Sequence, residues 1–257
     1  TASSMFALGP DGHYVVWWGW GSDLTVFDFQ AGKELPKIPG PTGDDKFYPS
    51  HVIFAGNDKL VGFAISQKMM KVWHLPDGKL LSTTKLGDKW GMADKASASP
   101  GGKYVAIQDS ITDRNIKLFE TETGTVVGDL SPKTATFADL VQLSFSPDGQ
   151  QFAALYEGSK ATGIALFNLS DGKLAELIEI APSIKASMDT EYTAQGLVWF
   201  PDGKKFLVHD MAVVDRAKQT LIYTFPKPSL RAAVRKPISG EMVATYDGDN
   251  KKGTLKA

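Results

Sequence analysis

The side chains that could carry acid–base or metal chemistry are scattered along this chain. None of its four histidines, His13, His51, His74 and His209, has a partner at the spacing of a His-x-x-x-His metal site. The absence of cysteine excludes disulfides, thiolate metal ligands and thiol nucleophiles. No Gly-x-Ser-x-Gly elbow occurs, and no glycine-rich phosphate loop follows a strand. We therefore expect no catalytic residues, no metal site and no cofactor.

One acidic run is similar to the start of a calcium loop. Asp247-Gly248-Asp249-Asn250 places several oxygens close together, which hard cations require. Lys251 and Lys252 follow at positions where an EF-hand supplies its turn glycine and further ligands. The interpretation that we prefer is a solvated turn, and Asp44-Asp45 has still less support as a cation site.

Composition and charge restrict the partners. The chain has 257 residues, a net charge of −1 and 42% hydrophobic residues. It has no overall basic field that would attract nucleic acid or anionic lipid. No apolar stretch reaches the length of a membrane span, so we expect no direct membrane insertion. The compartment stays open between cytoplasm and export, because proteins of both kinds can lack cysteine. The first residues do not resemble a signal peptide, and the missing initiator Met suggests an upstream segment.

The elements that position these side chains form an internal repeat. Five turn tripeptides each lie between two short apolar runs: Pro10-Asp11-Gly12, Asn57-Asp58-Lys59, Pro100-Gly101-Gly102, Pro147-Asp148-Gly149 and Pro201-Asp202-Gly203. A second series of turns alternates with the first, and its glycines lie about 46 residues apart at Gly32, Gly78, Gly124 and Gly172. Ala217-Lys218-Gln219 takes the fifth place without a glycine. Glycine at a fixed place in successive hairpins indicates backbone with a positive φ.

Between these turns lie runs of strand length that are rich in Val, Ile, Phe, Leu and Tyr. Four such runs per repeat, with a period near 45 residues, are typical of the blades of a β-propeller. The sequence thus predicts a single all-β propeller domain of four-stranded antiparallel blades. Five complete blades are expected at about 3–38, 48–86, 95–130, 139–180 and 194–226, with a partial sixth at 230–257. We expect either an incomplete ring or closure by residues outside this chain, and a parent propeller of six, seven or more blades.

The ends of the third strands resemble the WD40 family, and in particular its divergent bacterial-type repeats. The positions of the Trp-Asp pair hold Phe27-Asp28, Trp73-His74, Phe119-Glu120, Phe167-Asn168 and Val214-Asp215. The Gly-His pair of that family is not repeated here. The resemblance implies a protein-binding scaffold, whose blades must rely on apolar packing and backbone ladders without the histidine network.

Aromatic residues in the predicted loops give the only candidate contact face. Trp17 and Trp18 are expected in the core, because they lie on an inner strand. Trp20, Tyr48, Trp90 and Tyr192 fall in loops predicted to lie on one side, and we expect them to mark a shared face for a partner. The competing interpretation is that these side chains fill gaps between blades.

The sequence accordingly favours a non-catalytic interaction or scaffold module that binds a protein partner or another domain of its parent chain. The alternative is a propeller enzyme, or a binder of a small ligand or carbohydrate, which uses the central channel. Polar side chains from several blades would converge there without leaving a local motif. A third interpretation is a regulatory or sensor domain attached to a kinase or to a membrane anchor.

Overall fold

The computed structural model describes residues 5–19, 21–40, 46–88, 90, 96–108, 115–130, 139–181, 184, 196–225, 233–239, 242–249 and 252–256. None of these residues is helical, so no helix in this part of the chain could cross a membrane. The strands form five four-stranded sheets and one three-stranded sheet among the described residues. The predicted all-β architecture of four-stranded antiparallel units is confirmed.

The chain divides into two compact units, 1–131 and 132–257, and each is described by itself. Unit 1 holds three sheets. The first sheet consists of β1 (Met5–Leu8), β2 (Tyr14–Trp18), β3 (Thr25–Asp28) and β4 (Lys33–Glu34). The second sheet consists of β5 (His51–Ala55), β6 (Lys59–Ala64), β7 (Met69–His74) and β8 (Leu80–Lys85). The third sheet consists of β9 (Ala96–Ala98), β10 (Tyr104–Gln108), β11 (Ile116–Glu120) and β12 (Val126–Leu130).

Unit 2 holds the other three sheets. The fourth sheet consists of β13 (Asp139–Phe145), β14 (Gln151–Glu157), β15 (Thr162–Asn168) and β16 (Leu174–Ile180). The fifth sheet consists of β17 (Leu197–Trp199), β18 (Lys205–Val208), β19 (Ala212–Asp215) and β20 (Thr220–Thr224). The three-stranded sixth sheet consists of β21 (Ala233–Pro237), β22 (Val243–Asp249) and β23 (Lys252–Lys256).

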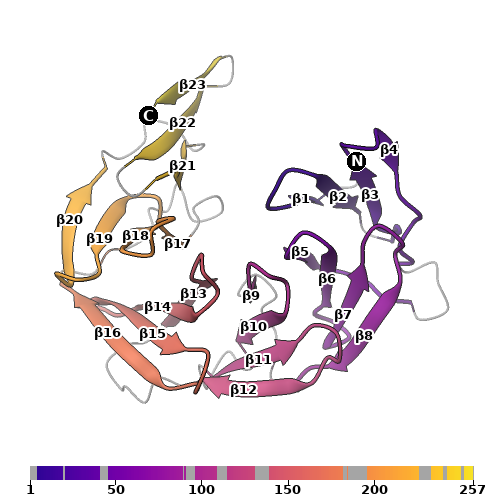
Figure 1. Cartoon of the computed structure of the whole chain (residues 1–257), viewed down its shortest axis with the longest axis horizontal. Helices are drawn as coiled ribbons and strands as arrows, with labels where there is room; N and C mark the ends of the chain where they lie inside the picture. The colour runs from indigo at the N-terminus through magenta and orange to yellow at the C-terminus, as the bar shows by residue number, and fades with distance from the viewer. Residues whose placement is uncertain are drawn as a thin grey trace. The chain divides into compact units, whose positions relative to one another are not determined.

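Each sheet is an up-and-down meander whose strands lie in chain order (Figure 1). Within each unit, the first strands of successive sheets contact one another, as β1 does β5 and as β13 does β17. Strands that alternate apolar side chains between two faces can bury both faces only between neighbouring sheets. The hydrophobic core therefore consists of separate clusters, one in each gap between consecutive sheets of a unit.

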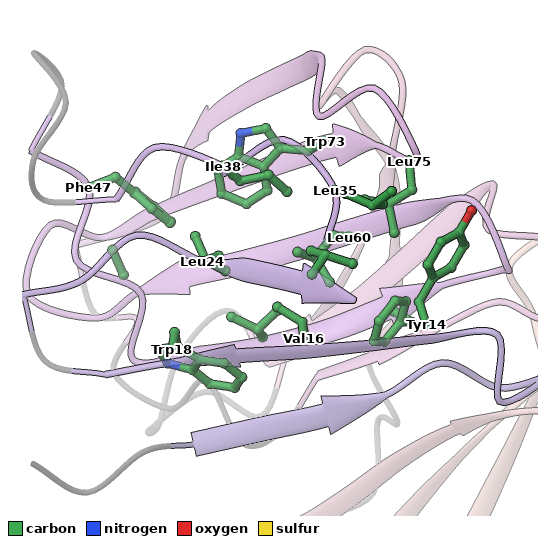
Figure 2. Packing of buried hydrophobic residues seen from close by; sticks show 14 residues of the cluster. Tyr14, Val16, Trp18, Leu24, Leu35, Ile38, Phe47, Leu60, Trp73 and Leu75 are labelled. Carbon is green, nitrogen blue, oxygen red and sulfur yellow. The ribbon is translucent and has the colours of Figure 1, made fainter. Parts of the chain in front are cut away.

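The cluster between the first and second sheets shows how this packing is built. Val16 and Trp18 of β2 alternate with half-buried neighbours and point into it, together with Leu24 and with Leu60 of β6 (Figure 2). Phe47 enters from the connection between the two sheets, and its ring lies edge-on to Trp73, with 5.6 Å between ring centroids. The burial of Trp18 agrees with its predicted place in the core, whereas Trp17 is half-buried.

Positive φ angles occur where the repeat places its glycines. Gly32, Gly78, Gly124 and Gly172 have φ between 64° and 69°, as the sequence predicts. Gln219, at the fifth place, has φ of 53° and adopts the same left-handed conformation without the freedom of glycine.

Buried hydroxyl groups make hydrogen bonds between and within the sheets of unit 1, in addition to apolar packing. Ser82 Oγ of β8 donates to the carbonyl oxygen of Thr121 at 2.7 Å. Thr121 Oγ1 donates in turn to the carbonyl oxygen of Gly102, also at 2.7 Å. The sequence predicts that apolar packing and the backbone hydrogen bonds of the sheets hold the blades together. These buried side-chain hydrogen bonds add to both, so that expectation is incomplete.

The acidic run near the end of the chain lies in a strand. Asp247, Gly248 and Asp249 belong to β22, and Asp249 pairs with Lys252 of β23 across the hairpin. Asn250 lies outside the described residues. The expected solvated turn is therefore replaced by strand at residues 247–249, because the ladder with β23 continues through them.

Candidate functional site

A pocket of about 320 Å³ lies at one end of the first two sheets. Its lining comes from the β2–β3 connection, the segment before β5 and the β6–β7 turn. We call it the Tyr48 pocket, and its lining residues are Gly19, Gly21, Tyr48, Pro49, Ser50, Ile65 and Ser66. Tyr48 is 41% exposed and Ile65 is 37% exposed, so both present apolar surface to a ligand.

Gln67 fixes the segment that carries Tyr48. Its Oε1 accepts the backbone N–H of Tyr48 at 2.8 Å, and its Nε2 donates to the carbonyl oxygen of Lys46 at 3.0 Å. One side chain of the β6–β7 turn thus holds the preceding connection on both sides of Phe47. Phe47 is buried while its neighbour Tyr48 faces outward, because adjacent residues of an extended segment point in opposite directions.

Two serines hold the other walls of the pocket. Ser50 Oγ donates to the carbonyl oxygen of Phe63 at 3.0 Å and accepts the N–H of Ile65 at 3.3 Å. Ser22 Oγ accepts the N–H of Gly19 at 2.8 Å and thereby closes the β2–β3 connection. These hydrogen bonds tie the lining to the neighbouring backbone, and a lining that is ordered in this way lowers the entropy cost of binding.

The chemistry of the lining is apolar with a few hydroxyl groups. Among the described residues that line the pocket, the phenol of Tyr48 is the only ionisable group. None of these residues carries a carboxylate, imidazole or amine group. The volume lies at the lower end of the about 300–1,000 Å³ that is typical of ligand sites. Such a pocket can hold one large apolar side chain.

The structure separates the four aromatic residues of the predicted contact face. Tyr48 is exposed beside the pocket. Trp90 is only 2% exposed, and its ring centroid lies 6.0 Å from that of Phe63 in the cluster between the second and third sheets. The expected exposure of Trp90 is therefore wrong, because this side chain fills the gap between two sheets. Trp20 and Tyr192 lie outside the described residues, so the shared face stays a prediction.

A second cluster, which sequence reasoning missed, lies in unit 2. His209 is 2% exposed, and its Nε2 lies 2.7 Å from Oε1 of Glu157 at the end of β14. His209 and Asp210 have φ of 52° and 55°, and the N–H of Met211 donates to the carbonyl oxygen of Val208. These features define a type I′ turn, which Asn-Gly would form with less strain. Non-glycine residues in such strained turns are concentrated at functional sites.

Two other histidines form pairs within their own sheets. Hydrogen bonds from the N–H groups of Ala31 and Gln30, with the imidazole of His13, hold the pKa of Asp28 below its usual range. The imidazole of His74 does the same for the pKa of Asp77, at 2.9 Å. Among the described residues, no three His, Asp or Glu side chains are arranged to hold a metal ion.

Comparison with known proteins identifies the fold. No protein-family model matches the chain, and no curated protein matches it in sequence. The structure is similar to hydrazine synthase from Kuenenia stuttgartiensis, with a TM-score of 0.55 and 18% sequence identity. The likeness covers 97% of this chain and 64% of that one, so this chain spans less than two thirds of its length. At this identity the likeness shows the β-propeller fold alone.

Proposed function

We propose that this chain is a non-catalytic binding module whose Tyr48 pocket takes an apolar side chain of a protein partner. The observation that carries the proposal is the lining of the pocket, whose described residues are apolar or carry a hydroxyl group and include no carboxylate, imidazole or amine. Exposed aromatic and aliphatic surface around a pre-formed hollow is typical of the anchor sites that dominate protein interfaces.

The binding energy expected from one anchor follows from the area that it buries. Burying an Ile-sized side chain contributes about 1.5–3 kcal/mol. Because Ile65 is 37% exposed, a partner can bury only about a third of this side chain, and removing it should weaken an anchored partner about two- to fivefold. The hydroxyl groups of Tyr48, Ser50 and Ser66 would orient the bound side chain and its backbone through hydrogen bonds.

Selection of peptides from a displayed random library against the whole chain tests this function. We expect the selected peptides to share an aromatic or large aliphatic residue at one position. Ile65→Ser should weaken their binding about two- to fivefold when measured by calorimetry. Leu80→Ser is the matched control, because Leu80 is a similarly exposed aliphatic residue of the same unit outside the pocket.

Peptides that bind Ile65→Ser and Leu80→Ser equally well would place the binding surface elsewhere and refute the assignment of the pocket. Turnover of a substrate by the chain, lost on substitution in the pocket, would refute the non-catalytic part. Both variants change exposed side chains, so thermal unfolding should stay close to that of the parent chain.

The second candidate is an enzyme or small-ligand binder that uses the pair formed by His209 and Glu157. An imidazole held by a carboxylate is the arrangement in which histidine serves as a general base. Neither side chain lines the Tyr48 pocket, which is why we rank this function second. A monosaccharide or other small molecule that raises the melting temperature of the parent chain, but not that of His209→Gln, would favour it.

A further inference from the structure

Arg216 of unit 2 contacts two neighbours, Glu176 and Trp199, which hold its side chain in one orientation. Its Nε donates to Oε2 of Glu176 on β16 at 2.8 Å. Its guanidinium carbon lies 5.9 Å from the centre of the Trp199 ring. Gln219 donates to the other carboxylate oxygen of Glu176 at 3.4 Å, so both oxygens of that group are engaged. An arginine fixed by stacking and by its Nε retains a fork of two terminal amino groups.

The two terminal amino groups of that fork make no side-chain hydrogen bond in the described part of the chain, although the charge of Arg216 also lowers the pKa of Asp148. The Nε bond to Glu176 is the one side-chain hydrogen bond that Arg216 makes among these residues, although its side chain is only 26% exposed. Terminal amino groups of a largely buried guanidinium need acceptors, and water or a ligand must supply them. The fork matches the geometry of an oxyanion, which it can bind through two parallel hydrogen bonds.

Two hollows adjoin Arg216. The smaller hollow, of about 170 Å³, is bounded by Ser146, Pro147, Asp148, Gln151, Trp199, Pro201, Asp202, Gly203 and Arg216. The larger hollow, of about 330 Å³, is bounded by Glu176, Gly203, Lys204, Lys205, Asp215, Arg216 and Ala217. Gly203 belongs to both, and a Cβ placed there would meet no atom within 4 Å, so the space beside the arginine is open.

The charges around the two hollows decide which one favours an anion. Three cations, Lys204, Lys205 and Arg216, and two carboxylates, Glu176 and Asp215, line the larger hollow. Its lining thus has one net positive charge. Asp148 and Asp202 outnumber the single cation around the smaller hollow, which therefore repels anions. A ligand with a single negative charge would balance the larger hollow, whereas a dianion would meet repulsion from the carboxylates nearby.

We propose that the larger hollow is a carboxylate-binding site, in which Arg216 binds both oxygens and Lys204 adds a second positive charge. The ligand class is a monoanionic carboxylate, such as an acidic side chain or the terminal carboxylate of a partner chain. The site shares no residue with the Tyr48 pocket, so a test of this site does not depend on the proposed function.

Titration of the whole chain with sodium acetate, followed by NMR at the Nε–H of Arg216 and the amide of Gly203, tests this site. Both signals should shift and saturate at millimolar acetate, and sodium chloride at equal ionic strength should not reproduce the change. Inorganic phosphate should bind more weakly than acetate. Tighter binding of phosphate would overturn the assignment to carboxylates, and shifts that do not saturate would overturn the site itself.

Two variants separate a bidentate site from a structural ion pair. Arg216→Lys keeps the charge but removes the fork, and it should weaken acetate binding at least about tenfold. Lys204→Ala leaves Arg216 intact and should weaken binding by a smaller factor at the Gly203 amide. Lys218→Ala is the matched control, because Lys218 is exposed in the same turn but lines neither hollow. If Arg216→Lys and Lys204→Ala bind acetate as tightly as the control Lys218→Ala does, the proposal is overturned. This holds even if Arg216→Lys is less stable than the parent chain.

Discussion

Replacing Gln219 by glycine should stabilise this protein. Gln219 occupies the place that glycine holds in four equivalent turns, and its φ is 53°. A non-glycine residue in this left-handed conformation costs about 1–2 kcal/mol. The greater conformational freedom of glycine in the unfolded chain offsets about 0.5–1 kcal/mol of the strain that is relieved. The net increase in the free energy of unfolding is therefore about 0.5–1 kcal/mol.

The side chain that the substitution removes contributes little against this gain. Gln219 is exposed, and the one hydrogen bond of its side chain among the described residues, from Nε2 to Oε1 of Glu176, is long at 3.4 Å. Glu176 retains its shorter bond to Arg216. A stabilisation of about 1 kcal/mol corresponds to a rise of about 2–4 °C in the melting temperature of a domain of this size.

Urea unfolding followed by circular dichroism measures the change, with an unchanged m value as the sign that only stability differs. Gly32→Gln is the reciprocal variant, because Gly32 has φ of 64° and no atom within 4 Å of an added Cβ. It should lower the free energy of unfolding by about the amount that Gln219→Gly adds. A lower midpoint for Gln219→Gly would refute the reasoning, since the backbone strain would then be smaller than the contribution of the side chain.

Two further predictions concern residues whose roles the structure assigns. Trp90→Ala should lower the free energy of unfolding by about 3–5 kcal/mol, because it empties a site between two sheets, whereas Tyr48→Ala should cost less than about 1 kcal/mol. Similar urea midpoints for these variants would contradict the burial of Trp90. Because the pKa of Asp28 is lowered in the folded state, its ionised form stabilises the protein above about pH 3.9, and this contribution is lost as the pH falls through the folded-state pKa. Asp28→Asn should therefore be less stable than the parent chain at about pH 7, and the difference in urea midpoint should shrink towards about pH 2.5; a constant difference would contradict the assignment.

The repeat could be predicted from the sequence because its signals are local. Pro-Asp-Gly turns and glycines at a fixed interval specify hairpins through the φ angles that each residue type allows. The four strands β13 to β16, which run from Asp139 to Ile180, correspond to the blade predicted at about 139–180. Even the place of Gln219 is predictable, since the register of its hairpin requires a positive φ whatever the residue is.

Side-chain direction in the connections between sheets was harder to predict. Phe47 and Tyr48 are adjacent aromatic residues, yet one is buried and the other is exposed. Trp90 lies in an equivalent connection and is buried, contrary to expectation. Connections lack the fixed alternation of a strand, so sequence alone does not indicate which of their aromatic residues fills the gap between two sheets.

The sequence by itself thus determined the β-propeller architecture and the places of its turns, because turn chemistry and strand period act over a few residues. Only the tertiary structure decided what meets across neighbouring sheets. Glu157 and His209 are widely separated in the sequence, and Glu176 and Arg216 are 40 residues apart, yet each pair is in contact. Such pairs depend on how one sheet packs against the next, and the sequence of a single strand carries no signal of that packing.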